Sequence, residues 1–246
     1  MTDYRIYRYS RRELIGNTAV YLALDGMISY LFFRSWIAFF LLFPGILFFL
    51  RDRKKQMLEK RKIRLQNQFL TGMQLVCTSL QAGYAVENAF REALPELEKI
   101  YDQDAFILQE FYFLVKQIGL NRTVEALLMD LGNRSGVEDI RNFAEVFSTA
   151  KRTGGDLIAI TRNTVSSIQQ KQETQQEIET SLSGKVMERN MMSAIPLFMI
   201  GYVEMTSPGF LDAMYHNAAG ITVMSVCLLI YGIAFLWGRK VTDIQV

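Results

Sequence analysis

The sequence predicts an all-α integral membrane protein in which a cytoplasmic helical bundle lies between two transmembrane hairpins. Half of the 246 residues are hydrophobic, and they are concentrated towards the two ends of the chain, with the charged residues between them. In the middle of the chain apolar residues recur at steps of three and four, which is the period of an amphipathic helix. The formal net charge of +2 gives no indication of a nucleic-acid partner.

The first apolar region, residues 14–50, predicts a hairpin of two spans. A helix rises about 1.5 Å per residue, so about 20 residues cross a bilayer core of about 30 Å. The segment 14–33 has that length, whereas 35–50 is about one turn short and needs local bilayer thinning or flanking anchors. One span followed by a buried or interfacial helix is the alternative. The run is too long for a cleaved signal peptide and lacks a small-residue cleavage site.

A second hairpin is expected over residues 191–238. The segment 191–206 is apolar apart from Glu204, and 220–237 is apolar throughout. The connection between them, which contains His216, carries no Lys or Arg. The first hairpin carries only Arg34 in its connection.

Basic residues flank both hairpins on their other side, which by the positive-inside rule places both termini and the middle of the chain in the cytoplasm. The flanking residues are Arg5, Arg8, Arg11, Arg12, Arg51, Arg53, Lys54, Lys55, Lys60, Arg61, Lys62, Arg64, Lys185, Arg189, Arg239 and Lys240. The expected organisation is a cytoplasmic segment 1–13, a hairpin 14–50, a cytoplasmic helical domain 51–190, a hairpin 191–238 and a cytoplasmic tail 239–246.

The cytoplasmic domain is expected to consist of short amphipathic helices that end at glycines. Gly83, Gly119 and the pair Gly154–Gly155 are the predicted elbows. Pro95 is expected to kink or split the second helix, and Ser135–Glu138 has the spacing of a capping box.

The last helix is expected to start near Asp156 and to run as a polar stalk towards the third span. Residues 169–177, QQKQETQQE, are polar on every face, and no Gly or Pro interrupts the segment before Gly184. A Gln-rich segment of low complexity is the competing interpretation. The stripe of Ile178, Leu182 and Val186 favours the helix.

No pattern of residues predicts catalysis, a metal site or a cofactor. A phosphate loop at Gly154–Gly155 would need a preceding strand and a lysine, and Asp156 instead suits a helix cap. His216 is the only histidine, and Cys77 and Cys227 lack neighbouring metal ligands. We therefore expect a protein that is not an enzyme.

Two acids fall within the expected spans, where ionisable side chains are costly and usually have a partner or a purpose. Asp25 is central in the first span, and Glu204 lies towards the outer end of the third. A packing lock, a subunit contact or a proton path are the functional interpretations. Alternatively, Glu204 reaches interfacial water, and Asp25 faces the protein interior or is protonated.

Several motifs of the middle and the C-terminal part resemble the type II secretion system F family, especially the platform proteins of Tad (Flp) pilus systems. They are LQAGYAVENAF at 80–90, VEALLMDLGNRSGVEDIRNFAEVFSTAKRTGGDL at 124–157, AIPLF at 194–198 and SPGFLDAM at 207–214. The resemblance covers about residues 66 to 240. It implies a scaffold without catalytic residues in the bacterial cytoplasmic (inner) membrane. This scaffold would couple a hexameric cytoplasmic secretion ATPase to the extraction of pilins or pseudopilins from the lipid bilayer.

The resemblance also implies a second platform protein or a homo-oligomer as a partner, and no nucleic acid. Exposed charges near the elbows are candidates for facing the ATPase, or form a merely solvated face. They are Arg134, Glu138, Asp139, Lys151, Arg152 and Asp156. Two other functions stay open. One is a permease subunit, because 124–132 loosely resembles the coupling loop of ABC-transporter permeases. The other is a membrane-anchored adaptor.

Overall fold

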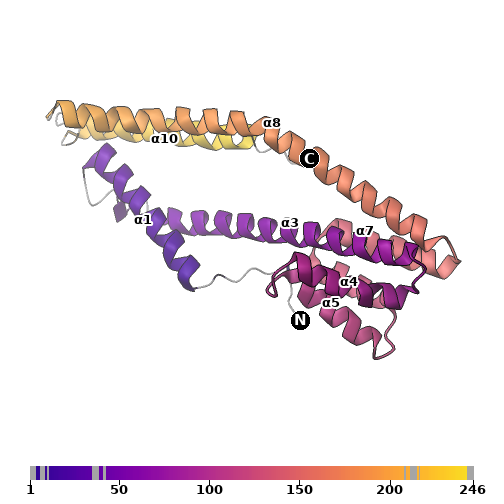
Figure 1. Ribbon diagram of the computed structural model, residues 1–246. Helices are drawn as coiled ribbons and strands as arrows, with labels where there is room; N and C mark the ends of the chain where they lie inside the picture. Colours follow the sequence, from indigo (N-terminus) through magenta and orange to yellow (C-terminus); the bar gives the residue numbers. More distant parts are fainter. Residues whose placement is uncertain are drawn as a thin grey trace. The chain divides into compact units, whose positions relative to one another are not determined.

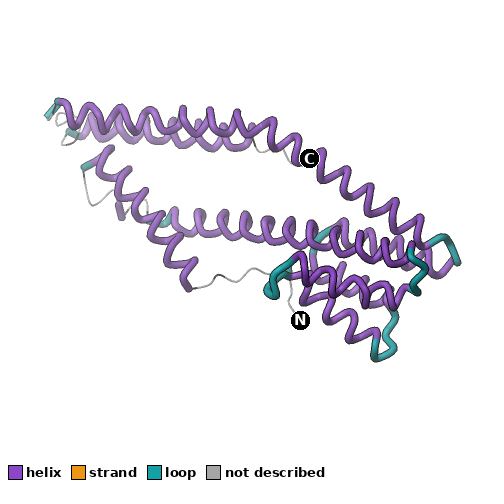
Figure 2. The backbone as a smooth tube through the Cα atoms, viewed as in Figure 1, coloured by secondary structure: helices purple, strands orange, loops and turns teal. Residues whose placement is uncertain are grey.

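The structure, a computed structural model, describes residues 4–5, 9, 11–34, 39–40, 43–207, 209–210, 215 and 217–242. Part of the expected second span (35–38 and 41–42), most of the expected connection around His216, and residues 243–246 of the tail lie outside the described residues. Within them the chain is all-helical, as predicted, and contains no strand (Figure 2). The helices are α1 (Arg11–Phe33), α3 (Gly45–Gln81), α4 (Val86–Ile100), α5 (Phe106–Ile118), α6 (Val124–Ser135), α7 (Glu138–Thr153), α8 (Leu157–Thr206) and α10 (Ala218–Thr242).

The chain divides into two compact units, which we call the bundle unit and the apolar unit. The described part of the bundle unit is Tyr4, Arg5 and 54–173, and that of the apolar unit covers 9–53 and 174–242. The long helices α3 and α8 each contribute residues to both units. The bundle unit covers 54–173 of the expected domain 51–190 and also takes in the start of the chain, whereas 174–190 belong to the apolar unit. The expected domain boundaries stay a prediction.

The bundle unit has one hydrophobic core, built from the stripes that the sequence predicts. Along α3 the buried positions Leu65, Phe69, Met73, Val76 and Leu80 follow the helical period. Facing aromatic rings join the helices: Phe69 meets Phe143 of α7 edge-on at 5.4 Å, and Phe90 of α4 meets Phe111 of α5 at 5.7 Å. Full burial of each such side chain contributes about 1.5–3 kcal/mol.

Close packing of α6 on α7 depends on Gly132. A Cβ atom at Gly132 would lie 2.8 Å from the Cα atom of Arg141, which is backbone and cannot move aside. The two helices are joined by a turn at Gly136, whose φ of 63° is left-handed.

One local prediction was wrong. Ser135 does not start a capping box: it is the last residue of α6, where its buried hydroxyl donates to the carbonyl of Gly132 at 2.9 Å and accepts from the N–H of Val137 at 3.2 Å. Of the two outcomes expected at Pro95, the split does not occur, because α4 continues through this residue, and the kink stays a prediction.

In the apolar unit, the C-terminal part of α8 and α10 lie side by side (Figure 1), as expected for the second hairpin. The Tyr231 hydroxyl of α10 donates to the carbonyl of Ser193 in α8 at 2.6 Å. A small cluster of Phe32, Tyr215 and Met224 joins α1 to α10, and the Tyr215 hydroxyl donates to the carbonyl of Leu31 at 2.9 Å.

Candidate functional site

The two units differ in how many large apolar side chains they expose. Among the described residues the bundle unit exposes few large hydrophobic side chains, namely Ile63, Tyr84, Ile100, Tyr112, Leu120 and Val146. All the others belong to the apolar unit, where Phe198 is 76% and Met205 86% exposed. Such a contiguous apolar surface calls for an apolar surrounding or partner.

Within the described residues two helices are long and apolar enough to cross a membrane by length and composition. They are Arg12–Phe33, of mean hydropathy 1.2, and Ala219–Val241, of mean hydropathy 2.2. The expected span 191–206 is not one of these two, since it is the end of the 50-residue helix α8 and carries Glu204. The expected span 35–50 is described only in part and stays a prediction.

Two ion pairs lie near the two ends of α10. Glu204 lies 3.3 Å from the guanidinium of Arg34, just after α1, where Phe33 and Leu31 pack near Tyr215. At the other end, Arg239 of α10 pairs with Asp52 of α3 at 2.9 Å. From Ala218 to Arg239 the helix α10 rises about 32 Å, which is close to the thickness of a bilayer core. Glu204 thus has a cationic partner within the protein, whereas the sequence alone left open that it only reaches interfacial water.

Asp25 differs from Glu204 because it is buried and incompletely paired. Its side chain lies in α1 one turn from Ser29, and both residues are only 4% exposed. The Oδ2 atom of Asp25 and the hydroxyl of Ser29 find no hydrogen-bond partner among the described residues. Asp25 therefore faces the interior of the apolar unit, one of the alternatives left open by the sequence.

Arg134, one of the six charges that the sequence made candidates for facing the ATPase, instead binds two acidic side chains of the bundle unit. Its Nη1 and Nη2 atoms donate to Glu110 of α5 at 3.1 and 2.8 Å, and its Nε atom donates to Asp130 at 2.7 Å. Burial disfavours the charge, but the hydrogen bonds of Glu110 and Asp130 outweigh it, so that the pKa of Arg134 is raised above its ordinary value. This arginine stabilises the contact of α5 with α6.

Lys151 and Asp139 also hold helices together. Lys151 of α7 donates to Glu87 of α4 at 3.0 Å and to Glu125 of α6 at 3.3 Å. Asp139 of α7 accepts from Gln66 of α3 at 2.6 Å and from Lys171 of α8 at 2.9 Å. Each therefore connects three helices of the bundle unit.

The elbow after α7 has a definite chemistry. Gly154 ends α7 with a left-handed φ of 72°, and the Oδ1 atom of Asp156 accepts from the N–H groups of Ile158 and Ala159, both at 3.0 Å, which caps α8. Gly155 follows without a positive φ. Asp156 thereby occupies the place that a phosphate would need.

The other two predicted elbows use different residues for the turn. Gly83 after α3 has a φ of 92°, whereas Gly119 at the end of α5 is right-handed, with φ of −63°. Asn121 supplies the left-handed conformation there, with φ of 61°, because Asn tolerates this region better than most residues.

Glu138 and Arg152 are the remaining two candidate charges. Both are exposed, and neither makes a hydrogen bond or an ion pair within the part of the chain that the structure describes. The hydrogen bond and charge of Glu145 raise the pKa of Arg141, and the charge of Glu138 contributes to this shift. Both Glu138 and Arg152 are open to a partner in solvent.

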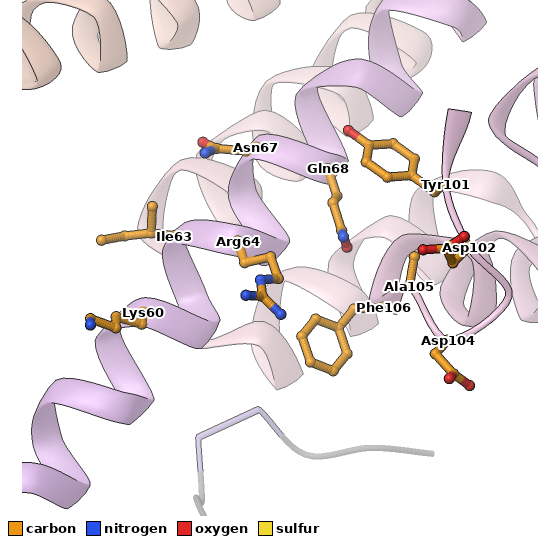
Figure 3. A pocket seen from close by; sticks show the side chains of 10 residues that line it. All are labelled: Lys60, Ile63, Arg64, Asn67, Gln68, Tyr101, Asp102, Asp104, Ala105 and Phe106. Atoms are coloured by element: carbon orange, nitrogen blue, oxygen red, sulfur yellow. The ribbon is translucent and has the colours of Figure 1, made fainter. Parts of the chain in front are cut away.

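A groove that the sequence did not predict lies between α3 and the loop from α4 to α5 (Figure 3). Its volume is about 660 Å³. Lys60, Arg64 and Asn67 line it from α3, and Asp102 and Asp104 line it from the loop. The opposed charges disfavour a purely anionic ligand such as free phosphate. Gln68, which also lines the groove, accepts a hydrogen bond from the N–H of Ile107 at 3.3 Å and so ties the start of α5 to α3.

Sequence reasoning also missed Tyr4, Arg61 and Glu110, which lie around Arg134. Of these three residues, only Glu110 could have been found from the sequence, because it is an acidic residue on the apolar face of α5. No group of three or more His, Cys, Asp or Glu side chains suited to a metal occurs in the described residues. No family model, curated protein or solved structure matches the chain.

Proposed function

We propose that the protein is an inner-membrane platform protein of a type II secretion or Tad-type pilus assembly system. In this role it couples a hexameric cytoplasmic ATPase to the extraction of pilins from the membrane and their assembly into a fibre. The apolar unit spans the bilayer as two hairpins, and the bundle unit and both termini lie in the cytoplasm.

The observation that carries the proposal is the contrast between the two units. The bundle unit buries its large apolar side chains in a core of its own, as a water-exposed domain does, while the apolar unit leaves most of its large apolar side chains exposed. The spacing of the ion pairs Arg34–Glu204 and Asp52–Arg239 along α10 supports a membrane-spanning arrangement of that unit.

The motifs that resemble the secretion family coincide with residues that have structural roles in the bundle unit. In 124–157, Gly132 allows the α6–α7 contact, Arg134 binds Glu110, Gly154 ends α7 and Asp156 caps α8. The motif residues therefore have definite structural roles in the bundle unit.

Continuity of the backbone suits the transmission of force. Helices α3 and α8 run without a break from residues of one unit into residues of the other. Glu138 and Arg152 are exposed and form no hydrogen bond or ion pair within the described residues, so they are available to receive the ATPase on the bundle unit.

Deletion of the gene from a bacterium that assembles such fibres tests the proposal. We expect fibres to be lost while the pilins remain in the membrane, and a plasmid copy to restore fibres. Normal fibres in the deletion strain would contradict the proposal. Altered solute uptake into membrane vesicles, with normal fibres, would instead identify a permease subunit.

A further inference from the structure

Tyr4 is completely buried in the bundle unit, although it precedes α1 and belongs to no helix. Its side chain enters a slot formed by three helices of that unit, with Arg61 from α3, Phe106 and Glu110 from α5, and Arg134 from α6. A tyrosine from a short segment outside the helices rarely has no exposed surface unless a specific site accepts it.

The ring of Tyr4 is held on two sides. It meets the ring of Phe106 edge-on, with 5.6 Å between centroids and an angle of 85° between planes. The guanidinium of Arg61 lies 4.9 Å from the centroid of the Tyr4 ring and also 4.9 Å from that of Phe106. Aromatic rings attract a cation over their faces, and this attraction grows when water is excluded.

The polar atoms of Tyr4 are also matched. Its hydroxyl donates to Oε1 of Glu110 at 3.0 Å, and its backbone N–H donates to the carbonyl of Arg134 at 3.2 Å. Glu110 is only 4% exposed, so its carboxylate depends on Tyr4 and Arg134 for solvation. Burial, and then the charge and hydrogen bond of Glu110, raise the pKa of the Tyr4 hydroxyl above its ordinary value, which keeps it a donor.

The next residue of the segment is also accommodated. Arg5 passes close to Gly136, where a Cβ atom would lie 3.1 Å from Cγ of Arg5. The absence of a side chain at Gly136 therefore leaves room for the segment beside the turn between α6 and α7.

We propose that this slot is a recognition site for a tyrosine side chain, and that residues 4–5 occupy it as a removable latch. The buried carboxylate selects a hydroxyl over the plain ring of phenylalanine, and its charge excludes phosphotyrosine. An empty slot accepts the same segment in trans. The latch fastens the segment before α1 to the end of α6, and it does not depend on the proposed function.

Peptide binding to the full-length chain in detergent tests the site. The labelled peptide is residues 1–9, with versions that carry Tyr4→Phe or Tyr4→Ala, and binding is followed by fluorescence polarisation. The proteins are the wild type, the Tyr4→Ala variant, and Tyr84→Ala as a matched control at an exposed tyrosine of the same unit.

We expect the native peptide to bind the Tyr4→Ala chain, and to bind the wild type and Tyr84→Ala chains at least tenfold more weakly because their slots are occupied. The Tyr4→Phe peptide should bind the Tyr4→Ala chain about tenfold more weakly than the native peptide, for the loss of one hydrogen bond to a charged group. The Tyr4→Ala peptide should not bind. Equal binding of the native and Tyr4→Ala peptides, or equal binding to all three proteins, would overturn the proposal.

Nitration of the wild-type chain gives a second test that needs no variant. Mass spectrometry should find Tyr4 modified at least tenfold more slowly than the exposed Tyr84, and excess native peptide should accelerate nitration of Tyr4 while the Tyr4→Ala peptide does not. Nitration of Tyr4 as fast as that of Tyr84 without peptide would show that there is no latch. A Tyr4 rate that no peptide changes would show that the segment is fixed in place.

Discussion

Glu110 and Arg134 form a two-pronged ion pair inside the bundle unit, with Nη1–Oε1 and Nη2–Oε2 distances of 3.1 and 2.8 Å. The pair joins α5 to α6, and the carboxylate is almost inaccessible to water. A charge in such a place is costly when its partner is removed, so the pair fixes how the two helices meet.

Replacement of Glu110 by Ala should lower the free energy of unfolding of the bundle unit by about 3 kcal/mol, because the partly buried guanidinium of Arg134 loses its two hydrogen bonds to this carboxylate. Hydrogen exchange of the backbone amides of α5 and α6 measures this loss. Glu145→Ala is the matched control, since its pair with Arg141 is exposed and is expected to contribute about 0.5 kcal/mol or less. Similar losses in the two variants would contradict the buried role of Glu110.

Lys151 should make the stability of the bundle unit depend on pH at the acid end. A hydrogen bond from its own backbone, and then that of Lys151, lower the pKa of Glu87 below 4.5. Burial acts against Lys151, but Glu87 and Glu125 outweigh it and raise the pKa of Lys151 above 10.5. A carboxylate whose pKa is lowered by folding stabilises the folded state at pH values above its pKa in the unfolded chain. A lysine whose pKa is raised by folding stabilises the folded state at pH values below its pKa in the unfolded chain. Both contributions are therefore complete between about pH 5 and pH 10.

Thermal melting followed by circular dichroism checks this dependence. The wild type should melt above Lys151→Met by a constant margin from about pH 5 to 9, and the margin should shrink as the pH falls through the lowered pKa of Glu87. Lys116→Met is the control, because Lys116 is exposed and forms no ion pair within the described residues. A difference in melting temperature that grows as the pH is lowered would contradict the stabilising interaction of Lys151 with Glu87.

Replacement of Gly154 by Val should destabilise the elbow between α7 and α8 and impair fibre assembly. The left-handed φ of 72° suits glycine, and a β-branched residue there costs about 1–3 kcal/mol even though the space around it is open. Gly184→Ala is the control within α8, where alanine should stabilise the helix by up to about 1 kcal/mol. Normal fibre assembly by Gly154→Val would show that the elbow is only a connection.

Reversal of charge should reveal whether Arg34 and Glu204 interact in the membrane. Arg34→Glu or Glu204→Arg alone brings two like charges together and should lower the amount of folded protein in the membrane, whereas the double exchange should restore most of it. Immunoblotting of membrane fractions gives the readout. If the double variant lost as much membrane protein as the two single variants together, Arg34 and Glu204 would not interact.

Reporter fusions at residues 34 and 216 test the orientation that the charge distribution predicts. Both should report the outside of the cytoplasmic membrane, because basic residues are concentrated on the opposite side. A cytoplasmic signal at either position would contradict the topology of two hairpins.

The sequence predicted those parts of the fold that depend on periodicity. Leu65, Phe69 and Met73 repeat at helical steps, and residues 157–183 contain no Gly or Pro, so the core of α3 and the first part of α8 were both foreseeable. The continuation of α8 through Gly184 and Pro196 was not, because both residues are ordinarily helix breakers. The left-handed turn at Asn121 was missed because glycine two residues earlier is the stronger turn signal. Tyr4 was missed because its partner Glu110 is 106 residues away, and no local pattern encodes such a contact.

Co-purification with a secretion ATPase tests the proposed role most directly. The tagged full-length chain is extracted from its own membrane in a gentle detergent, and the bound proteins are identified by mass spectrometry. We expect the hexameric ATPase and a pilin to be recovered with the chain, and the Arg152→Glu variant to recover less ATPase than Lys116→Glu. Recovery of intact chain from the membrane with neither an ATPase nor a pilin would contradict the role of a platform protein.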